Sequence, residues 1–146
     1  MATVRQILQG KKRPLSTVRP DARVYDALKL MAAEEIGALL VIDGERLVGI
    51  ISERDYARKV ILHGKSSHDI PVRDIMTERV VCVTQDRTIE ECMALMTDKH
   101  IRHLPVIEDD RLIGVLSIGD LVKEKISEQQ FTIKQLESYI QSDYPT

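Results

Sequence analysis

Two short segments of the chain contain the residue types best suited to binding chemistry. In each, an apolar stretch is followed by a serine and, three residues later, an aspartate: Ser52 with Asp55, and Ser117 with Asp120. At a helix start, a serine hydroxyl and a carboxylate can accept hydrogen bonds from backbone N–H groups that lack partners. The same position can hold a phosphate, and a carboxylate can accept from both hydroxyls of a ribose diol. The two pairs are therefore interpreted as helix caps, as parts of a nucleotide site, or as both.

A second candidate group is the pair Arg102 and His103, which stands at the entrance to an apolar run. Arginine offers planar donors to a phosphate, and histidine adds a positive charge when it is protonated. The pair is interpreted either as two surface cations or as a phosphate clamp. The equivalent positions earlier in the chain hold Gly37 and Ala38, so we expect two unequal sites. Charge for the weaker, first site could come from Arg54 and from the run Lys11–Arg13.

The other clusters of reactive residues do not match known catalytic or metal-binding patterns. His100, His103 and Cys92 lack the spacing of a zinc site. Glu90-Glu91 and Asp109-Asp110 are adjacent pairs whose side chains point in different directions, so paired acid–base catalysis is not expected. The sequence contains no nucleophile elbow, P-loop or Gly-x-Gly-x-x-Gly motif. We therefore expect no enzymatic activity, no metal and no catalytic cofactor.

An internal repeat determines which elements position these residues. A shift of 65 residues places Val18–Tyr56 over Val83–Leu121 without a gap, and about a third of the overlaid positions are identical. The hydrophobic pattern in each copy predicts the order β-α-β-β-α, with Asp21 and Asp86 near the N-caps of the first helices. The expected strands are Thr17–Arg19, Ala38–Ile42 and Leu47–Ile51 in the first copy, and Cys82–Thr84, a run from Leu104 and Leu112–Leu116 in the second.

The expected domain boundaries follow from this repeat. Residues 1–65 form the first repeat with an N-terminal lead-in, residues 66–127 the second repeat with its linker, and residues 128–146 a helical tail. In the tail, Phe131, Ile133 and Leu136 recur at near-helical spacing. This spacing predicts an amphipathic helix that either packs on its own domain or on a dimer mate, or binds a dedicated partner.

The composition limits the possible classes of protein. A chain of 146 residues can bury one substantial core. The net charge of −2 and the 3% aromatic content give no reason to expect nucleic-acid binding. No apolar run is long enough to span a bilayer. Two cysteines form neither a disulfide framework nor a metal-ligand spacing, which favours a reducing, cytoplasmic location.

Taken together, these features resemble a tandem pair of CBS domains, or Bateman module. The resemblance covers nearly the whole chain, and it is carried by the duplicated β-α-β-β-α order, the Gly-x-x-Ser-x-x-Asp turns, the run Asp74–Thr77 and the run Ile101–Ile107. It implies an α/β fold in which two repeats pack about a pseudo-twofold axis, followed by a C-terminal helix. It also implies a free-standing regulatory protein that often forms head-to-head homodimers.

Such modules bind adenosine-containing ligands in clefts between the repeats, so the resemblance implies AMP as the favoured ligand, with ADP, ATP or NAD(H) as alternatives. Asp120 is then the ribose ligand, Ser117 a nearby hydroxyl contact, and Arg102 with His103 the phosphate clamp. The predicted site of the second repeat, which is favoured, consists of Ser117, Asp120, Arg102, His103, Thr84, Leu104 and Val115. The weaker predicted site of the first repeat consists of Ser52, Asp55, Arg54, Gly37, Ala38, Thr17 and Ile50. The alternative function is a ligand-free scaffold for protein interactions.

Overall fold

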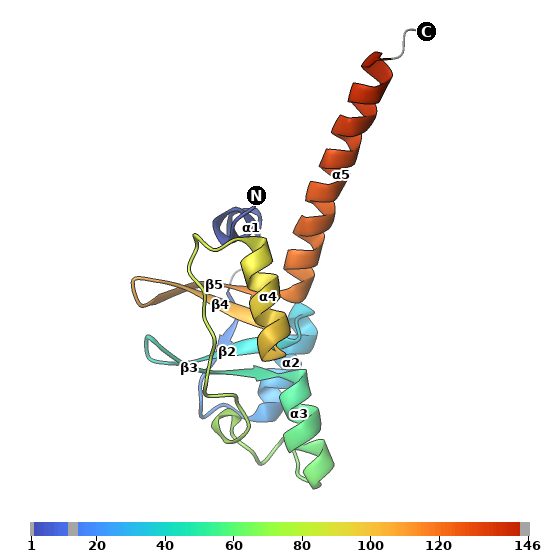
Figure 1. Ribbon diagram of the computed structural model, residues 1–146. Coiled ribbons are helices and arrows are strands. Elements are labelled where there is room, and N and C mark those ends of the chain that lie inside the picture. The colour runs from blue at the N-terminus through green and yellow to red at the C-terminus, as the bar shows by residue number, and fades with distance from the viewer. Residues whose placement is uncertain (1, 12–14, 144–146) are drawn as a thin grey trace.

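A computed structural model describes residues 2–11 and 15–143, with side chains through residue 138. Its strands form two small sheets that lie side by side, and both hairpins point away from the helices (Figure 1). The first sheet contains β1 (Thr17–Val18), β2 (Ala38–Asp43) and β3 (Arg46–Ser52), and the second contains β4 (His103–Glu108) and β5 (Arg111–Ser117). The predicted α/β fold with two repeats is confirmed.

The two sheets have the same internal register. Strands β2 and β3 pair antiparallel with an irregularity between Val41 and Ile42, and β4 and β5 repeat it between Val106 and Ile107. β1 pairs parallel to β2. The strand expected at Cys82–Thr84 is reduced to a single parallel bridge between Val83 and Val106. The central residues of β2 and β4 are buried, as their nearly continuous apolar runs predict.

The first helix of each repeat begins later than the aspartates suggest. α2 (Val24–Glu34) has Arg23 as its N-cap, and α4 (Ile89–Lys99) has Thr88, whose side chain accepts a hydrogen bond from the backbone of Glu91. The expectation that the N-caps lie near Asp21 and Asp86 is therefore corrected by two residues. Both aspartates accept hydrogen bonds from neighbouring side chains in the preceding turn, Asp21 from Arg19 and Asp86 from Thr84.

Each repeat is completed by a lead-in segment that packs on the other repeat's core. α1 (Val4–Gly10) buries Val4 and Ile7 among the residues of the second repeat, whereas Val72 of η2 (Val72–Asp74) and Ile75 are buried with the first. The described part of the chain therefore starts on the second repeat, reaches the first between α1 and β1, and returns after η2. The domain boundaries given above divide the sequence, but each hydrophobic core contains residues from both sides of the boundary at residue 65.

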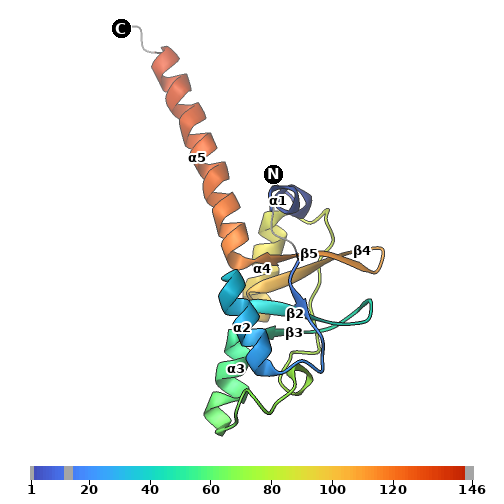
Figure 2. The ribbon, with the colours of Figure 1, turned by 180° about the vertical axis from the view of Figure 1, so that it is seen from behind.

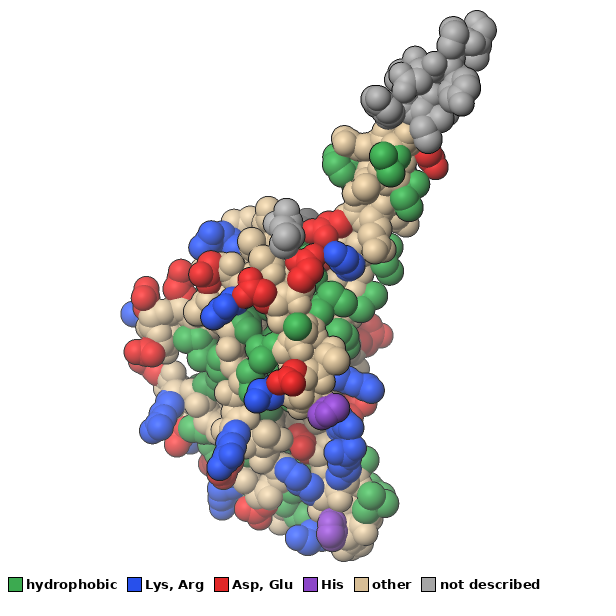
Figure 3. Space-filling model, viewed as in Figure 1, with side chains coloured by type: hydrophobic (Ala, Val, Ile, Leu, Met, Phe, Trp, Pro, Cys, Tyr) green, Lys and Arg blue, Asp and Glu red, His purple; other side chains and the backbone are tan. Residues whose placement is uncertain are grey.

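The second helices differ greatly in length. α3 (Glu53–Lys59) is followed by the short η1 (Ile61–His63), whereas α5 (Ile118–Asp143) runs for 26 residues and projects from the body (Figures 1 and 2). The second helix of repeat two and the predicted helical tail are thus one continuous helix. Along its projecting part, Phe131, Ile133 and Leu136 are exposed, and apolar side chains are visible there on the surface (Figure 3). None of the described helices is both long and apolar enough to cross a membrane.

Candidate ligand-binding cleft between the two repeats

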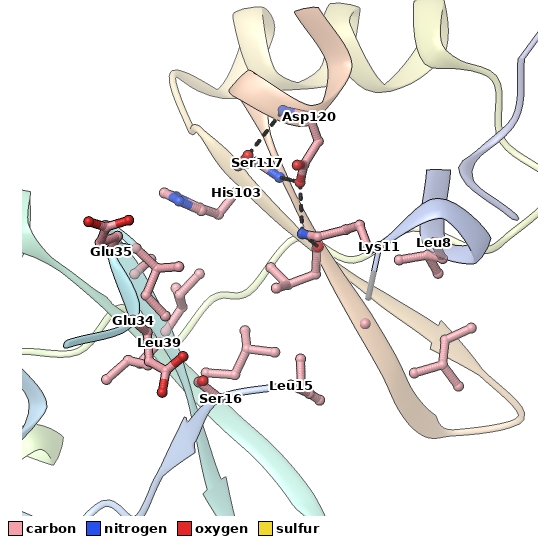
Figure 4. A pocket seen from close by; sticks show the side chains of 18 of the residues that line it. Leu8, Lys11, Leu15, Ser16, Glu34, Glu35, Leu39, His103, Ser117 and Asp120 are labelled. Carbon is pink, nitrogen blue, oxygen red and sulfur yellow. Dashed lines mark hydrogen bonds and ion pairs between the residues drawn. The ribbon is translucent and has the colours of Figure 1, made fainter. Parts of the chain in front are cut away.

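A cleft with a volume of about 600 Å³ lies between the repeats and is lined by both of them. One wall is formed by the helix start at Ser117 and Asp120 together with His103, and the facing wall by the end of α2 and by β2 (Figure 4). The crossing segment between α1 and β1 contributes Lys11 and Ser16. The apolar side chains that line the cleft include Leu8, Leu15, Ile36, Leu39, Leu40, Ile50, Ile113 and Val115. This volume and mixed lining are typical of a small-molecule site.

Ser117 and Asp120 are held together by the geometry of the helix start. The Ser117 backbone N–H donates to Asp120 Oδ2 (2.8 Å), and the Asp120 backbone N–H donates to Ser117 Oγ (3.1 Å). This reciprocal pair fixes the aspartate side chain and satisfies two backbone donors. The capping interpretation of these residues is therefore correct, and it leaves the carboxylate beside the cleft.

Lys11 was not among the residues predicted for this site. Its Nζ donates to Asp120 Oδ2 (2.8 Å) and to the Val115 carbonyl oxygen (2.9 Å) (Figure 4). Among the described residues, no hydrogen bond or ion pair reaches Asp120 Oδ1, and the Asp120 side chain is 25% exposed. One oxygen of the carboxylate is thus engaged, and the other is available to a ligand.

The charge states in the cleft follow from these contacts. Burial by itself raises the pKa of Asp120, but hydrogen bonds from Lys11 and Ser117 and the Lys11 charge outweigh burial and lower the pKa below its usual value. Burial lowers the pKa of His103 below 6.5, the Asp120 charge opposes this shift, and Lys11 and Arg102 add to it. Near neutral pH the cleft therefore presents an ionised carboxylate and a neutral imidazole.

The facing wall is acidic. Glu34 and Glu35 lie at the end of α2, across the cleft from Asp120 (Figure 4). Glu35 has a left-handed backbone with φ of 55° because it caps the C-terminus of the helix. Lys123 lines the cleft from α5. The wall of the first repeat therefore presents carboxylates, whereas the opposite wall presents Lys11 and Lys123 together with the Asp120 carboxylate.

The structure gathers residues from both predicted sites into this single cleft. Four members of the favoured list line it, namely Ser117, Asp120, His103 and Val115, and three members of the weaker list join them, namely Gly37, Ala38 and Ile50. The remaining members of the favoured list lie elsewhere. Leu104 is fully buried in the core, Arg102 is exposed outside the lining, and Thr84 borders a separate hollow with Asp86 and Glu108.

Asp55, the equivalent of Asp120, is more fully occupied. Its Oδ2 accepts from the backbone N–H and the hydroxyl of Ser52, both at 3.0 Å. Its Oδ1 accepts from the Thr77 hydroxyl at 3.4 Å and lies 3.5 Å from Lys59 Nζ. The Asp55 side chain is only 15% exposed. Of the other members of the weaker list, Thr17 pairs with Leu40 in the sheet, and Arg54 and Thr17 are both exposed outside the cleft lining.

The location of Lys11 corrects one expectation. The run 11–13 was expected to supply charge to the first site, but Lys11 bonds to Asp120 of the second repeat. Lys12 and Arg13 lie outside the described residues. The sequence contains one signal for this contact. The segments before the two copies, Val4–Ile7 and Val72–Ile75, are similar, and the basic run follows the first of these segments closely. The signal is obscured because the extra residues of the Gly10–Pro14 loop break the register of the repeat.

The sequence of this chain matches proteins that are already known. A family model described as the CBS domain matches residues 4–62 and 72–127. A curated relative from Arabidopsis thaliana, the mitochondrial CBS domain-containing protein CBSX3, is 45% identical over 129 residues, which cover 85% of this chain and 63% of the relative. This chain therefore corresponds to less than two thirds of that protein.

Solved structures agree with the fold. A protein from Burkholderia ambifaria, described as a signal-transduction protein with CBS domains, is 53% identical, with a TM-score of 0.85 and coverage of 90% of this chain and 99% of that one. The CBS domain pair of protein MJ0100 was solved in complex with 5′-methylthioadenosine and S-adenosyl-L-methionine; it is 25% identical, with a TM-score of 0.77 and coverage of 88% and 98%.

Proposed function

Since the chain belongs to the CBS-domain family, we propose that it is a non-catalytic regulatory module that binds an adenosine-containing ligand in the cleft between its repeats. In this proposal the ribose hydroxyls donate to Asp120, and the adenine ring lies among the apolar side chains of the lining. A change in the packing of the repeats, or in partner binding, transmits the signal. Such coupling requires the ligand to have different affinities for the two states.

The observation that carries the proposal is the state of the Asp120 carboxylate. It is ionised and held by the helix start, and the described residues leave its Oδ1 without a hydrogen bond at the edge of a cleft of about 600 Å³. A carboxylate oxygen positioned in this way accepts a hydroxyl group without reorganisation of the protein. The adenosine compounds bound by the MJ0100 domain pair support the same class of ligand.

The charges of the cleft favour a mononucleotide over a triphosphate. Lys11 and Lys123 offer positive charge on the side of Asp120, and the Glu35 carboxylate faces them from the first repeat. A single phosphate can remain on the cationic side, whereas a longer chain of phosphates extends toward Glu35 and is repelled. We therefore propose AMP as the preferred ligand, with ADP, ATP and NAD(H) binding more weakly.

Isothermal titration calorimetry with AMP, ADP, ATP and NAD(H) tests this function. The Asp120→Asn variant should bind AMP about 10- to 100-fold more weakly than wild type, because it loses a charged acceptor worth roughly 1.5–3 kcal/mol. The matched control is Asp26→Asn, since Asp26 is an exposed acid on α2 outside the cleft lining. Thermal unfolding of both variants without ligand separates loss of binding from loss of the helix cap. Equal affinity of wild type and Asp120→Asn for AMP would contradict the proposed role.

The exposed apolar side chains on the projecting part of α5 favour a second function, a scaffold for protein interactions. Phe131 is 63%, Ile133 54% and Leu136 58% exposed, and exposed apolar side chains of this size are typical of surfaces that bind another protein. A pure scaffold predicts no rise in unfolding temperature with millimolar adenosine ligands, whereas a sensor is stabilised by mass action. The proposal also includes a homodimer, which the resemblance to CBS-domain pairs implies, and a cytoplasmic location, which the two cysteines favour.

A further inference from the structure

Lys11 is fixed in the cleft more firmly than a surface lysine. Its Nζ donates both to Asp120 Oδ2 at 2.8 Å and to the Val115 carbonyl oxygen at 2.9 Å, and its side chain is 30% exposed. An ammonium group has three N–H donors, and these two bonds use two of them. The third donor remains for a group that enters the cleft. Because the side chain is already ordered, such a group binds without a further entropic cost of ordering the lysine.

The other cations near the cleft are less suited to hold an anion. His103 lines the cleft, but its burial keeps the imidazole neutral near pH 7. Arg102 is exposed and lies outside the lining. Lys123 belongs to the lining but is exposed on α5, so its charge is screened by solvent. Among the described residues, Lys11 is thus the cation that is both ordered and next to the proposed ribose ligand.

We propose that Lys11 determines whether the cleft prefers an adenosine ligand with an anionic group at the 5′ position over one without. This inference rests on the proposed function, because it takes Asp120 as the acceptor of the ribose hydroxyls. With Oδ1 used by the ribose, Oδ2 keeps its bond to Lys11, and the third N–H of the ammonium donates to an oxygen of the 5′ phosphate. Adenosine makes every contact except this one.

The location of Lys11 adds a consequence for the fold. Lys11 lies in the segment that carries the chain from α1, on the second repeat, to β1, on the first. An anionic ligand bound to Lys11 and Asp120 therefore contacts this crossing segment as well as the helix start of α5. Adenosine contacts the helix start and the apolar walls but makes no contact with the Lys11 ammonium group.

The test compares AMP with adenosine by calorimetry on wild type and on the Lys11→Met and Lys11→Arg variants. Wild type should bind AMP at least tenfold more tightly than adenosine. Lys11→Met should lose about 10- to 100-fold in affinity for AMP, as expected for one charge-assisted hydrogen bond, with less than a threefold change for adenosine. Lys11→Arg keeps the charge and should retain the preference for AMP. The matched control is Lys134→Met, at an exposed position on the projecting part of α5.

The outcomes separate this inference from the proposed function. If wild type binds AMP and adenosine equally, or if Lys11→Met weakens both alike, the cleft binds adenosine ligands and Lys11 does not select among them. If wild type binds neither compound, the proposed function fails and this inference fails with it. An unfolding temperature for ligand-free Lys11→Met within a few degrees of wild type ensures that the comparison is made on folded protein.

Discussion

The glycines in the middle of the two returning strands offer a stringent test of how the lead-in segments pack. At Gly49 in β3, an added Cβ would lie 2.6 Å from Met76 Sδ and 3.0 Å from the Thr77 carbonyl oxygen. Ordinary contacts of this kind are about 3.5–4.0 Å. The Thr77 backbone cannot move away easily, because its N–H and C=O are both bonded to the backbone of Ile50, at 2.8 and 3.0 Å. The Met76 side chain can rotate away, but relief of the contact with the Thr77 carbonyl oxygen must come from a shift of β3 or from loss of these bonds.

The equivalent Gly114 in β5 has a softer neighbour. An added Cβ there would lie 2.7 Å from Leu8 Cδ2, and the next contacts, at 3.4 and 3.6 Å, belong to the same side chain. Leu8 also lines the cleft, so it has space into which it can rotate. The two positions are related by the repeat, but one substitution meets backbone and the other meets only the end of a flexible side chain.

We expect Gly49→Ala to lower the free energy of unfolding by about 1–2 kcal/mol, which is the cost of overpacking (about 1–3 kcal/mol) reduced by the loss of unfolded-state entropy (about 0.4–1 kcal/mol). Gly114→Ala should change it by less than about 1 kcal/mol. Urea unfolding followed by circular dichroism measures both values, and with a slope of about 2 kcal/mol/M the midpoint of Gly49→Ala falls by roughly 0.5–1 M. A larger loss for Gly114→Ala than for Gly49→Ala would refute this account of the packing.

Two further predictions concern pH. Burial lowers the pKa of His103, so the folded state resists protonation of the imidazole. An NMR titration of the ring should therefore have a midpoint below pH 6.5. A midpoint at or above 6.5 would show that the ring is not desolvated. The pKa of Asp120 lies below its ordinary value of 3.8, so the ionised form stabilises the fold at pH values above 3.8. This stabilisation is lost as the pH falls through the lower pKa of the folded state. The difference in unfolding free energy between wild type and Asp120→Asn, measured in urea at pH 7, 5 and 3, should therefore shrink toward pH 3, and a constant difference would contradict the assignment.

Much of the fold is encoded in local patterns and can be predicted from sequence. The apolar runs of β2 and β4, the turns after them and the Ser-x-x-Asp helix starts each depend on a few neighbouring residues, and the repeat supplies every one of them twice. The swapped lead-ins are different, because they depend on long-range packing. The apolar residues Val4 and Ile7 predict a buried face, but nothing in their spacing indicates which of two similar cores covers it.

The candidate site was predictable to the extent that it is local. Ser117 and Asp120 are three residues apart, and their reciprocal hydrogen bonds follow from that spacing. Lys11 reaches the same carboxylate from 109 positions away, so its role depends on how the chain crosses between the repeats. His103 was expected to add charge on protonation, but the charge state of an imidazole depends on its burial, which only the packed structure provides.

The pseudo-twofold axis accounts for the absence of Arg102 from the Asp120 cleft. Its equivalent, Gly37, lines that cleft, and the carbonyl groups of both residues accept from the start of the following helix, at 2.8 Å for Arg102 and 3.1 Å for Gly37. By this symmetry we expect Arg102 on the side of Asp55, whose carboxylate already has partners on both oxygens. The repeat has thus separated the arginine from the carboxylate that remains open to a ligand. Of the two lysines among the described residues of the cleft lining, Lys11 is bonded to that carboxylate and Lys123 is exposed. The anion contact proposed beside Asp120 therefore comes from the crossing segment, which lies outside the aligned repeat, rather than from the duplicated elements.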